Sequence, residues 1–374
     1  MTRPGIISKN NIPIYQPDLG GNEREYVLDC IDSTWISSKG KYLPLFEQAF
    51  AQYVGGSFAT GVCNGTVALH LSLVALSLGP GDEVIVPTLT YVASANAISY
   101  TGAKPVFVDS LRDTWQMDPK DVVRKITSRT RAIMVVHLYG HPCDMDAILS
   151  IAKRHGLFVI EDCAEAFGSR YHGKHVGTFG DIATFSFYGN KTITTGEGGM
   201  VVTNDAILLD RVVHFKGQGL VADRQYWHDV IGYNYRMTNI CAAIGLAQLE
   251  RADEFLARKR QLAKYYIERL TGLPVEVHRE SPNVTHSYWM ISVLARSPDE
   301  RDLLQAELAD AGIETRPTFY PIHTMPMYAT NLESHTVADD IGSRGVVLPS
   351  WPGLPTAAID QICVAIARFY SKNL

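Results

Sequence analysis

One lysine stands where it could act as a nucleophile. Lys191 lies among small and polar residues in the stretch from Phe185 to Met200, between two short apolar runs. Most loop lysines are solvated and take part in no reaction. A lysine that is desolvated at the end of a sheet has a lowered pKa, and its amine can then form a Schiff base with a carbonyl compound.

Three carboxylates follow one apolar run. Glu161, Asp162 and Glu165 come at the end of the run that begins at Leu157. Ligands of open α/β sheets bind at the carboxyl ends of parallel strands, and an acid buried there needs a cation or a protonated ring nitrogen as its partner. The alternative is that one or two of these acids only cap the next helix.

A small polar turn precedes an apolar helical stretch. Asn64, Gly65 and Thr66 stand directly before a run that continues to Leu78. A helix that begins there would offer unpaired backbone N–H groups and its positive dipole end to a phosphate. Ordinary helix capping by Asn64 and Thr66 is the competing interpretation.

Alternating apolar runs and helix-length segments predict the elements that position these groups. The runs are short, rich in Val, Ile and Phe, and typical of strands buried on both faces; they lie at residues 83–87, 105–109, 131–139, 157–163, 183–188 and 199–204. Residues 189–198 are too few for a covering helix, so the last strand is expected to run antiparallel to its neighbours. The pattern predicts a doubly wound, mostly parallel α/β sheet.

The pattern changes in the second half of the chain. Residues 240–270 predict a long helix or a bent pair of helices. A strand at 288–294, a helix at 298–311, a short strand at Ile313 and a final helix at 357–369 predict a smaller α/β unit. We therefore expect a large domain over residues 1–250, which includes the N-terminal segment, and a small C-terminal domain over residues 251–374.

Composition excludes several classes of function. The 34 basic and 39 acidic residues give a net charge of −5, without the concentrated basic face that nucleic acid requires. No apolar stretch is long enough for a membrane span, and six dispersed cysteines favour a reduced, cytoplasmic protein. His137 and His141 have a helical metal spacing, but Gly140 and Pro142 break a helix there, so no metal is expected.

Five motifs together resemble those of the DegT/DnrJ/EryC1/StrS aminotransferases. The motifs are Asn64-GTVAL, Pro87-TLTYVASANAI, Val159-IEDCAEAFGS, Phe185-SFYGNKTITTGEGG and Gly232-YNYRMTN. The resemblance spans nearly the whole chain. It implies the type I aminotransferase fold, with a mostly parallel seven-stranded sheet and a smaller C-terminal α/β domain, and the cofactor pyridoxal 5′-phosphate (PLP), which passes through pyridoxamine phosphate.

The resemblance also implies roles for residues of the cofactor site. Lys191 matches the lysine that holds the cofactor and moves the proton, and Asp162 matches the acid under the pyridine nitrogen. The remaining cofactor positions are the stacking Tyr91, the phosphate contacts Gly65, Thr66 and Ser186, and Asn234, which in the family reaches the phosphate of the neighbouring subunit. A homodimer with shared active sites is therefore implied, and further association of dimers is left open.

One position departs from the wider family. Glu165 stands where many members carry Gln against the cofactor ring oxygen, and an ionised Glu would repel that oxygen. A narrower branch that acts on a GDP-linked sugar is similar at this position. Substrate positions implied by the same comparison are Trp35, Ser37, Arg236, Tyr320 and His323, each of which has a structural role as the alternative.

The reaction implied by this branch is a transamination. L-glutamate would donate its amino group to GDP-4-keto-6-deoxy-D-mannose, and 2-oxoglutarate would be released. A related branch, the sugar 3-dehydratases, carries His in place of the lysine, so Lys191 favours amino transfer. A UDP- or dTDP-linked keto sugar as substrate, and a non-catalytic regulator that binds PLP or a sugar nucleotide, are the alternatives.

Overall fold

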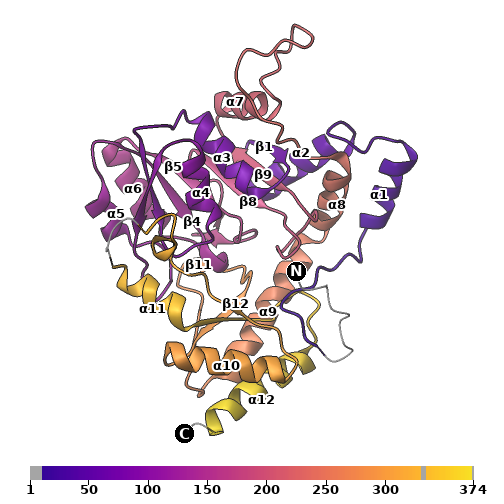
Figure 1. Cartoon of the computed structure of the whole chain (residues 1–374). Helices are drawn as coiled ribbons and strands as arrows, with labels where there is room; N and C mark the ends of the chain where they lie inside the picture. Colours follow the sequence, from indigo (N-terminus) through magenta and orange to yellow (C-terminus); the bar gives the residue numbers. More distant parts are fainter. Residues whose placement is uncertain (1–10, 330–333, 373–374) are drawn as a thin grey trace.

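The computed structural model describes residues 11–329 and 334–372. A large sheet between two layers of helices forms the upper part of the molecule in Figure 1. A smaller sheet with its own helices lies below it, and the long helix α9 connects the two parts. Among these residues, no helix is both long and apolar enough to cross a membrane.

The large sheet has seven strands in the order β1-β9-β8-β5-β4-β2-β3. Strand β9 runs antiparallel to both β8 and β1, which confirms the orientation predicted for the last strand. The bounds, in sheet order, are β1 Phe58–Val62, β9 Gly199–Thr203, β8 Ile182–Ser186, β5 Phe158–Asp162, β4 Thr130–Val136, β2 Glu83–Pro87 and β3 Lys104–Val108. The apolar runs account for six of these strands, and β1 is the seventh.

Helices cover both faces of this sheet because the strands alternate their side chains. In β2, Val84 and Val86 pack on one face and Ile85 on the other. The first face is covered by α3 (Gly65–Ala75), α4 (Ala93–Tyr100) and α7 (Ala206–Lys216). The second is covered by α2 (Tyr42–Val54), α5 (Pro119–Lys125), α6 (Met145–His155) and α8 (Asn239–Glu250), and α1 (Glu23–Asp32) packs on α8.

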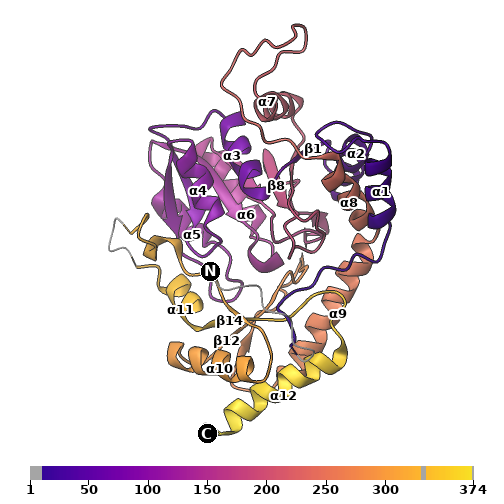
Figure 2. The same cartoon turned by 45° about the vertical axis from the view of Figure 1, so that its right-hand side comes forward.

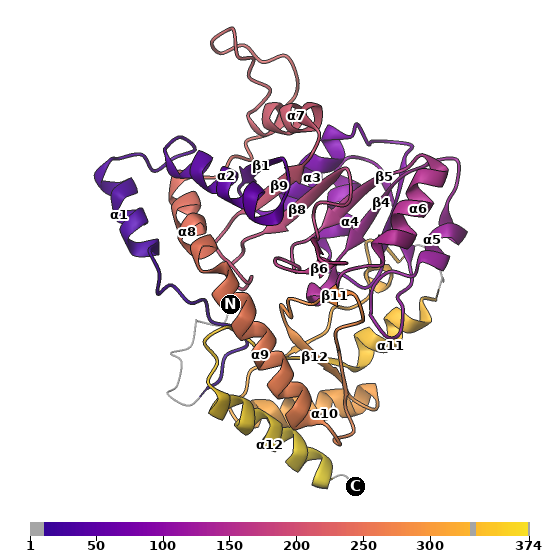
Figure 3. The same cartoon turned by 180° about the vertical axis from the view of Figure 1, so that it is seen from behind.

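A bent pair of helices joins the large and small parts. Helix α8 ends at Glu250 and α9 (Ala252–Leu270) begins after the single residue Arg251. Of the two interpretations of residues 240–270, the bent pair is thus correct. Figures 2 and 3 show α9 running down from the large sheet to the smaller one, with the N-terminal segment beside it.

The smaller sheet is antiparallel, in the order β10-β12-β14-β13. Its strands are β10 Glu276–Val277, β12 Ile291–Leu294, β14 Gly345–Leu348 and β13 Arg316–Pro317, and its helices are α10 Pro298–Asp310, α11 Thr336–Arg344 and α12 Thr356–Lys372. The strand expected at Ile313 is wrong: Ile313 forms an isolated parallel bridge with Ile12, and β13 follows it.

Short elements complete the chain. A three-stranded sheet joins β11 (Val284–Thr285) to β6 (Arg170–Tyr171) and β7 (Lys174–His175), and two 3-10 turns lie at Leu138–Gly140 and Ile322–Thr324. The division into domains 1–250 and 251–374 stays a prediction. Residues 1–10, 330–333 and 373–374 of these two predicted domains lie outside the described part of the chain.

Candidate active site

A cavity of about 690 Å³ opens at the carboxyl ends of the central parallel strands. Its walls come from the start of α3, the ends of β5 and β8, the loop between β8 and β9, and residues of the smaller part. Seven of the residues predicted to hold the cofactor line it: Gly65, Thr66, Tyr91, Asp162, Glu165, Ser186 and Lys191. This is the ligand position expected of an open α/β sheet.

The amine of Lys191 lies against an aromatic ring. Its Nζ is 3.7 Å from the centroid of the Trp289 ring, and no hydrogen bond joins it to any residue that the structure describes. Burial lowers the pKa of Lys191, and the nearby carboxyl groups of Glu165 and Asp162 oppose that shift. A buried amine with a lowered pKa loses its proton more readily than the amine of an exposed lysine. This matters because only the neutral amine is a nucleophile.

Asp162 is the last residue of β5 and is almost fully buried. Its Oδ2 accepts a hydrogen bond from the Ser94 hydroxyl at 2.8 Å, and its Oδ1 accepts one from the Ala164 N–H at 3.1 Å. Burial raises the pKa of Asp162, although these two donors and Lys191 act in the other direction. A positively charged partner in the cavity would stabilise the ionised carboxylate.

Glu165, which also lines the cavity, is held by a backbone N–H group. Its Oε2 accepts a hydrogen bond from the Tyr139 N–H at 2.8 Å. Burial raises the pKa of Glu165 to about 7, against the opposing effects of Lys191 and the Tyr139 N–H. Near neutral pH a large share of this carboxyl group is therefore protonated and can donate a hydrogen bond to a negatively charged oxygen.

The start of α3 forms the anion-binding end of the cavity. Asn64 caps the helix by accepting a hydrogen bond from the Val67 N–H at 3.0 Å. The Gly65 backbone passes so close to Ser186 that an added Cβ would lie 2.8 Å from the Ser186 Cβ. The free N–H groups of this first turn, with the hydroxyls of Thr66 and Ser186, line one wall.

Aromatic rings and the hydroxyl of Ser94 complete the walls of the cavity. Tyr91, which is 57% exposed, has its ring centroid 5.7 Å from that of Phe319. Trp289 and Phe319 reach the cavity from the smaller part, and Ser94 reaches it from α4. Ser94 shares a predicted motif with Tyr91, but nothing in its spacing marked it; Trp289 lies in a stretch predicted as a strand.

Four other predicted residues lie outside this cavity on an exposed edge. Asn234, Arg236, Trp35 and Ser37 are all exposed. The Arg236 guanidinium donates to the Asn234 Oδ1 at 3.1 Å, and Arg236 bridges to Val62 at the end of β1. Asn239 fixes the other segment, since its Nδ2 donates to the Trp35 carbonyl at 2.7 Å and its N–H donates to the Ser37 carbonyl at 2.6 Å.

Tyr320 and His323 follow Phe319 but do not line the cavity either. Tyr320 is exposed, whereas both ring nitrogens of His323 have partners. The His323 Nδ1 lies 2.7 Å from the Thr88 hydroxyl, and its Nε2 lies 3.3 Å from Asp339. These contacts connect the segment before α11 to the end of β2. The predicted substrate roles of both residues stay predictions.

Glu161 belongs to a separate buried group with His137 and Cys163, whose ligand-type atoms lie within 4.8 Å of one another. Its carboxylate accepts three backbone N–H groups, from Gly177, Phe179 and Gly180, each at 2.7 Å. The His137 Nδ1 accepts the Cys143 N–H at 3.0 Å, so its Nε2 carries the proton that faces Glu161 at 3.1 Å. These partners satisfy the buried carboxylate from within the protein.

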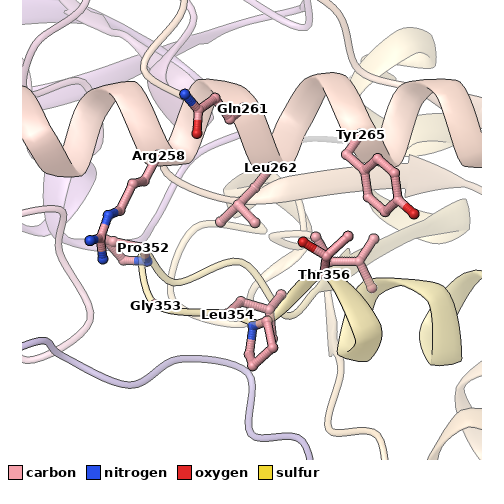
Figure 4. A pocket seen from close by; sticks show the side chains of 10 residues that line it. Arg258, Gln261, Leu262, Tyr265, Pro352, Gly353, Leu354 and Thr356 are labelled. Carbon is pink, nitrogen blue, oxygen red and sulfur yellow. The ribbon is translucent and has the colours of Figure 1, made fainter.

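A second pocket, of about 390 Å³, lies between α9 and the loop before α12 (Figure 4). Figure 4 shows Arg258, Leu262 and Tyr265 on the helix, opposite the loop that carries Pro352. No carboxylate, thiol or lysine is among its lining residues. The groups needed for acid–base or nucleophilic chemistry are in the first cavity.

The residues of the first cavity fit PLP. The Lys191 amine, which has no hydrogen-bond partner within residues 11–329 and 334–372, suits the aldehyde. A buried carboxylate suits the pyridine nitrogen, and the close approach of Gly65 to Ser186 at the start of α3 suits the phosphate. The buried Asn190 Oδ1, which also lines the cavity, has no hydrogen-bond partner among the described residues. Such an atom is expected where a bound molecule completes the hydrogen bonding.

Comparison with known proteins agrees with this fit. The pattern of the DegT/DnrJ/EryC1/StrS aminotransferase family matches residues 17–367. GDP-perosamine synthase of Escherichia coli O157:H7 is 64% identical over 362 residues, which cover 97% of this chain and 99% of that protein.

Two solved structures have the same architecture. DesV of S. venezuelae, in complex with a ketimine intermediate, is 36% identical, with a TM-score of 0.88 over 93% of this chain and 94% of that one. A Streptococcus pneumoniae protein described as a sugar aminotransferase, in its PLP form, is 29% identical, with a TM-score of 0.92 over 97% of this chain and 100% of that one. The chain is a PLP-dependent aminotransferase and belongs to the DegT/DnrJ/EryC1/StrS family.

Proposed function

We propose that this protein transfers the amino group of L-glutamate to GDP-4-keto-6-deoxy-D-mannose, giving GDP-perosamine and 2-oxoglutarate. The observation that carries the proposal is the cavity itself, in which the Lys191 amine, the Asp162 carboxyl group and the start of α3 come together. The GDP-linked substrate is supported by the 64% identity to a GDP-perosamine synthase along nearly the whole chain.

Each group of the cavity has a role in this reaction. When bound, PLP supplies the electron sink for the carbanion. Lys191 holds the cofactor and carries the proton to and from the substrate carbon through its Nζ. Asp162, oriented by Ser94 and the Ala164 N–H, keeps the ring nitrogen protonated. Gly65, Thr66 and Ser186 bind the phosphate, and Tyr91 covers the ring.

The exposed residues serve a neighbouring subunit in this proposal. Asn234 lies outside the cavity of its own chain, next to Arg236. In a homodimer it would reach the cofactor phosphate of the partner, and Trp35, Ser37, Arg236, Tyr320 and His323 would contact the nucleotide sugar. The enzyme would act in the cytoplasm, in O-antigen biosynthesis.

The first test is spectroscopic. Purified protein that has been mixed with PLP and then freed of unbound PLP is expected to be yellow, and Lys191→Ala is expected to lose or alter that absorbance band because the amine that condenses with the aldehyde is gone. Lys264→Ala, at an exposed position of α9, is the matched control and should keep the band. A colourless wild-type protein would contradict the proposal.

The second test concerns the substrate. Turnover with L-glutamate and 4-keto sugars linked to GDP, UDP or dTDP should favour the GDP sugar. A preference for the UDP or dTDP compound would leave the chemistry intact and overturn the substrate. Binding without any turnover would instead indicate a non-catalytic regulator.

A further inference from the structure

Two hydrogen-bond donors from distant parts of the chain hold the backbone around Lys191. The Tyr15 hydroxyl donates to the carbonyl oxygen of Lys191 at 2.7 Å. The Trp289 Nε1 donates to the carbonyl oxygen of Asn190 at 2.8 Å. Two consecutive peptide groups are therefore fixed, one from the N-terminal segment and one from the residues that precede β12.

The ring of Trp289 also limits where the amine can go. The side chain is 5% exposed, and its ring stacks on Tyr139 with centroids 6.2 Å apart and planes 15° apart. The Lys191 Nζ lies 3.7 Å from the centroid of this ring. The contact excludes water from one side of the amine, and it attracts the amine when the amine is charged.

A buried lysine connects the two donors. The Lys259 Nζ donates to the carbonyl oxygen of Trp289 at 2.8 Å and also to that of Ser350. The Ser350 N–H in turn donates to the Ile14 carbonyl at 3.4 Å, and the Lys259 Nζ lies 5.8 Å from the Tyr15 ring. Lys259 is on α9, which the N-terminal segment accompanies in Figures 2 and 3.

We propose that Tyr15 and Trp289 are positioning residues that fix the backbone of the Lys191 loop and direct its amine into the cavity. The inference rests on the proposed role of Lys191. A lysine side chain has four rotatable bonds, so its amine is placed accurately only when the backbone and one face are held. Small displacements of a reacting group lower the rate of the chemical step even when the substrate still binds.

Two conservative variants test the positioning. Tyr15→Phe removes only a hydroxyl, and Trp289→Phe keeps an aromatic face but removes the N–H. Because one net hydrogen bond is worth about 0.5–1.5 kcal/mol, each should lower kcat about 2- to 13-fold. The KM for glutamate should change less than about twofold, since neither hydrogen bond is made to substrate.

The matched control is Tyr370→Phe. The Tyr370 hydroxyl donates to the Glu300 Oε1 at 2.7 Å, a hydrogen bond in the smaller part of the molecule that involves none of the residues holding the Lys191 loop. This variant should lose a similar amount of stability and keep the wild-type kcat. A kcat loss equal to that of Tyr15→Phe would show that general loosening, rather than the Lys191 loop, causes the effect.

A second measurement needs no bound cofactor. Acetylation of Lys191 by acetic anhydride can be followed by peptide mass spectrometry across pH, with the exposed Lys264 as internal reference. Both Tyr15→Phe and Trp289→Phe should raise the pH midpoint of Lys191 acetylation, because the amine becomes more exposed to water, whereas Tyr370→Phe should leave the midpoint unchanged.

The outcomes separate this inference from the proposed function. Folded variants with wild-type kcat and wild-type acetylation midpoints would overturn the positioning role. A wild-type protein that takes up no PLP would overturn the proposed function, and the acetylation midpoints would still decide whether Tyr15 and Trp289 hold the amine.

Discussion

Glu165 occupies an unusual position for a carboxyl group that faces a cofactor site. It is buried, its Oε2 accepts the Tyr139 N–H, and burial raises its pKa to about 7. In the protonated form it can donate a hydrogen bond to the ring oxygen of PLP, as a Gln side chain would. The repulsion anticipated for an ionised Glu is therefore reduced at neutral pH, and Glu can serve at this position.

The titration of Glu165 predicts a pH-dependent stability of the cofactor-free protein. Between about pH 4.5 and pH 7 the folded state binds the proton and the unfolded state does not, so this contribution to the free energy of unfolding decreases as pH rises. The Glu165→Gln variant has no titrating carboxyl group at this position and therefore lacks this pH-dependent contribution. Urea unfolding should show the variant gaining about 1–3 kcal/mol over wild type between pH 4.5 and pH 8.

The exposed Glu268 supplies the control for this experiment. Glu268→Gln should follow the wild-type pH profile. A Glu165→Gln profile parallel to that of wild type would show that the carboxyl group titrates normally in the folded protein.

The residues of the site that could be predicted were those that lie in the motifs of the resemblance. By residue type alone, Lys191 could be a solvated loop lysine and Asp162 a helix cap, and only the resemblance implied their roles. Ser94 and Trp289 were not predicted, because a serine in a helix and a tryptophan beside a strand are ordinary. Their roles depend on what they contact across the fold.

At the scale of elements, the start of α3 is defined by the close approach of two backbones. The first turn of the helix lies against the end of β8, and Gly65 permits this because an added Cβ would lie 2.8 Å from the Ser186 Cβ. The two elements together bring N–H groups and hydroxyls to one wall of the cavity.

Gly65→Ala should therefore separate α3 from β8. The clash is expected to cost about 1–3 kcal/mol of stability and to weaken PLP binding about 10-fold, because the phosphate wall moves. Fluorescence titration of the cofactor-free protein with PLP measures the affinity. At Gly79 the nearest atom to an added Cβ is the Thr101 carbonyl oxygen at 3.7 Å, so Gly79→Ala should bind PLP normally. Equal affinities for the two variants would contradict the close-approach argument.

Strands buried on both faces were predictable as elements because their apolar runs are continuous. Strand β1 was missed since Phe58–Val62 carries Thr and Gly within five residues, and only its pairing with β9 makes it a strand. In the same way, β13 has two residues and depends on β14. The sequence therefore predicted the strands that have a continuous apolar run. It did not predict β1 and β13, which are strands only because they pair with a neighbouring strand.

For the whole molecule, the proposed homodimer is supported by exposed side chains around Asn234. Large apolar side chains are exposed in the segments that flank it: Trp35 (55%), Ile36 (50%), Tyr226 (84%) and Ile231 (92%). In the proposed homodimer a second copy of the chain would cover these side chains.

Mixing two inactive variants tests whether active sites are shared. Lys191→Ala and Asn234→Ala each disable both sites of a homodimer. If Asn234 serves the partner's site, a mixed dimer has one site with both substitutions and one intact site. Unfolding and refolding an equal mixture should restore about one quarter of wild-type activity. If Asn234 acts within its own chain, the mixture should stay as inactive as its components.

The cavity walls come from widely separated parts of the chain. Gly65, Asp162, Lys191, Trp289 and Phe319 all line the same space. A nascent polypeptide thus lacks the far wall until Phe319 has left the ribosome. A complete enclosure for vitamin B6 therefore requires synthesis of nearly all of the chain, and a polypeptide that stops before Trp289 would leave one side of the cavity open.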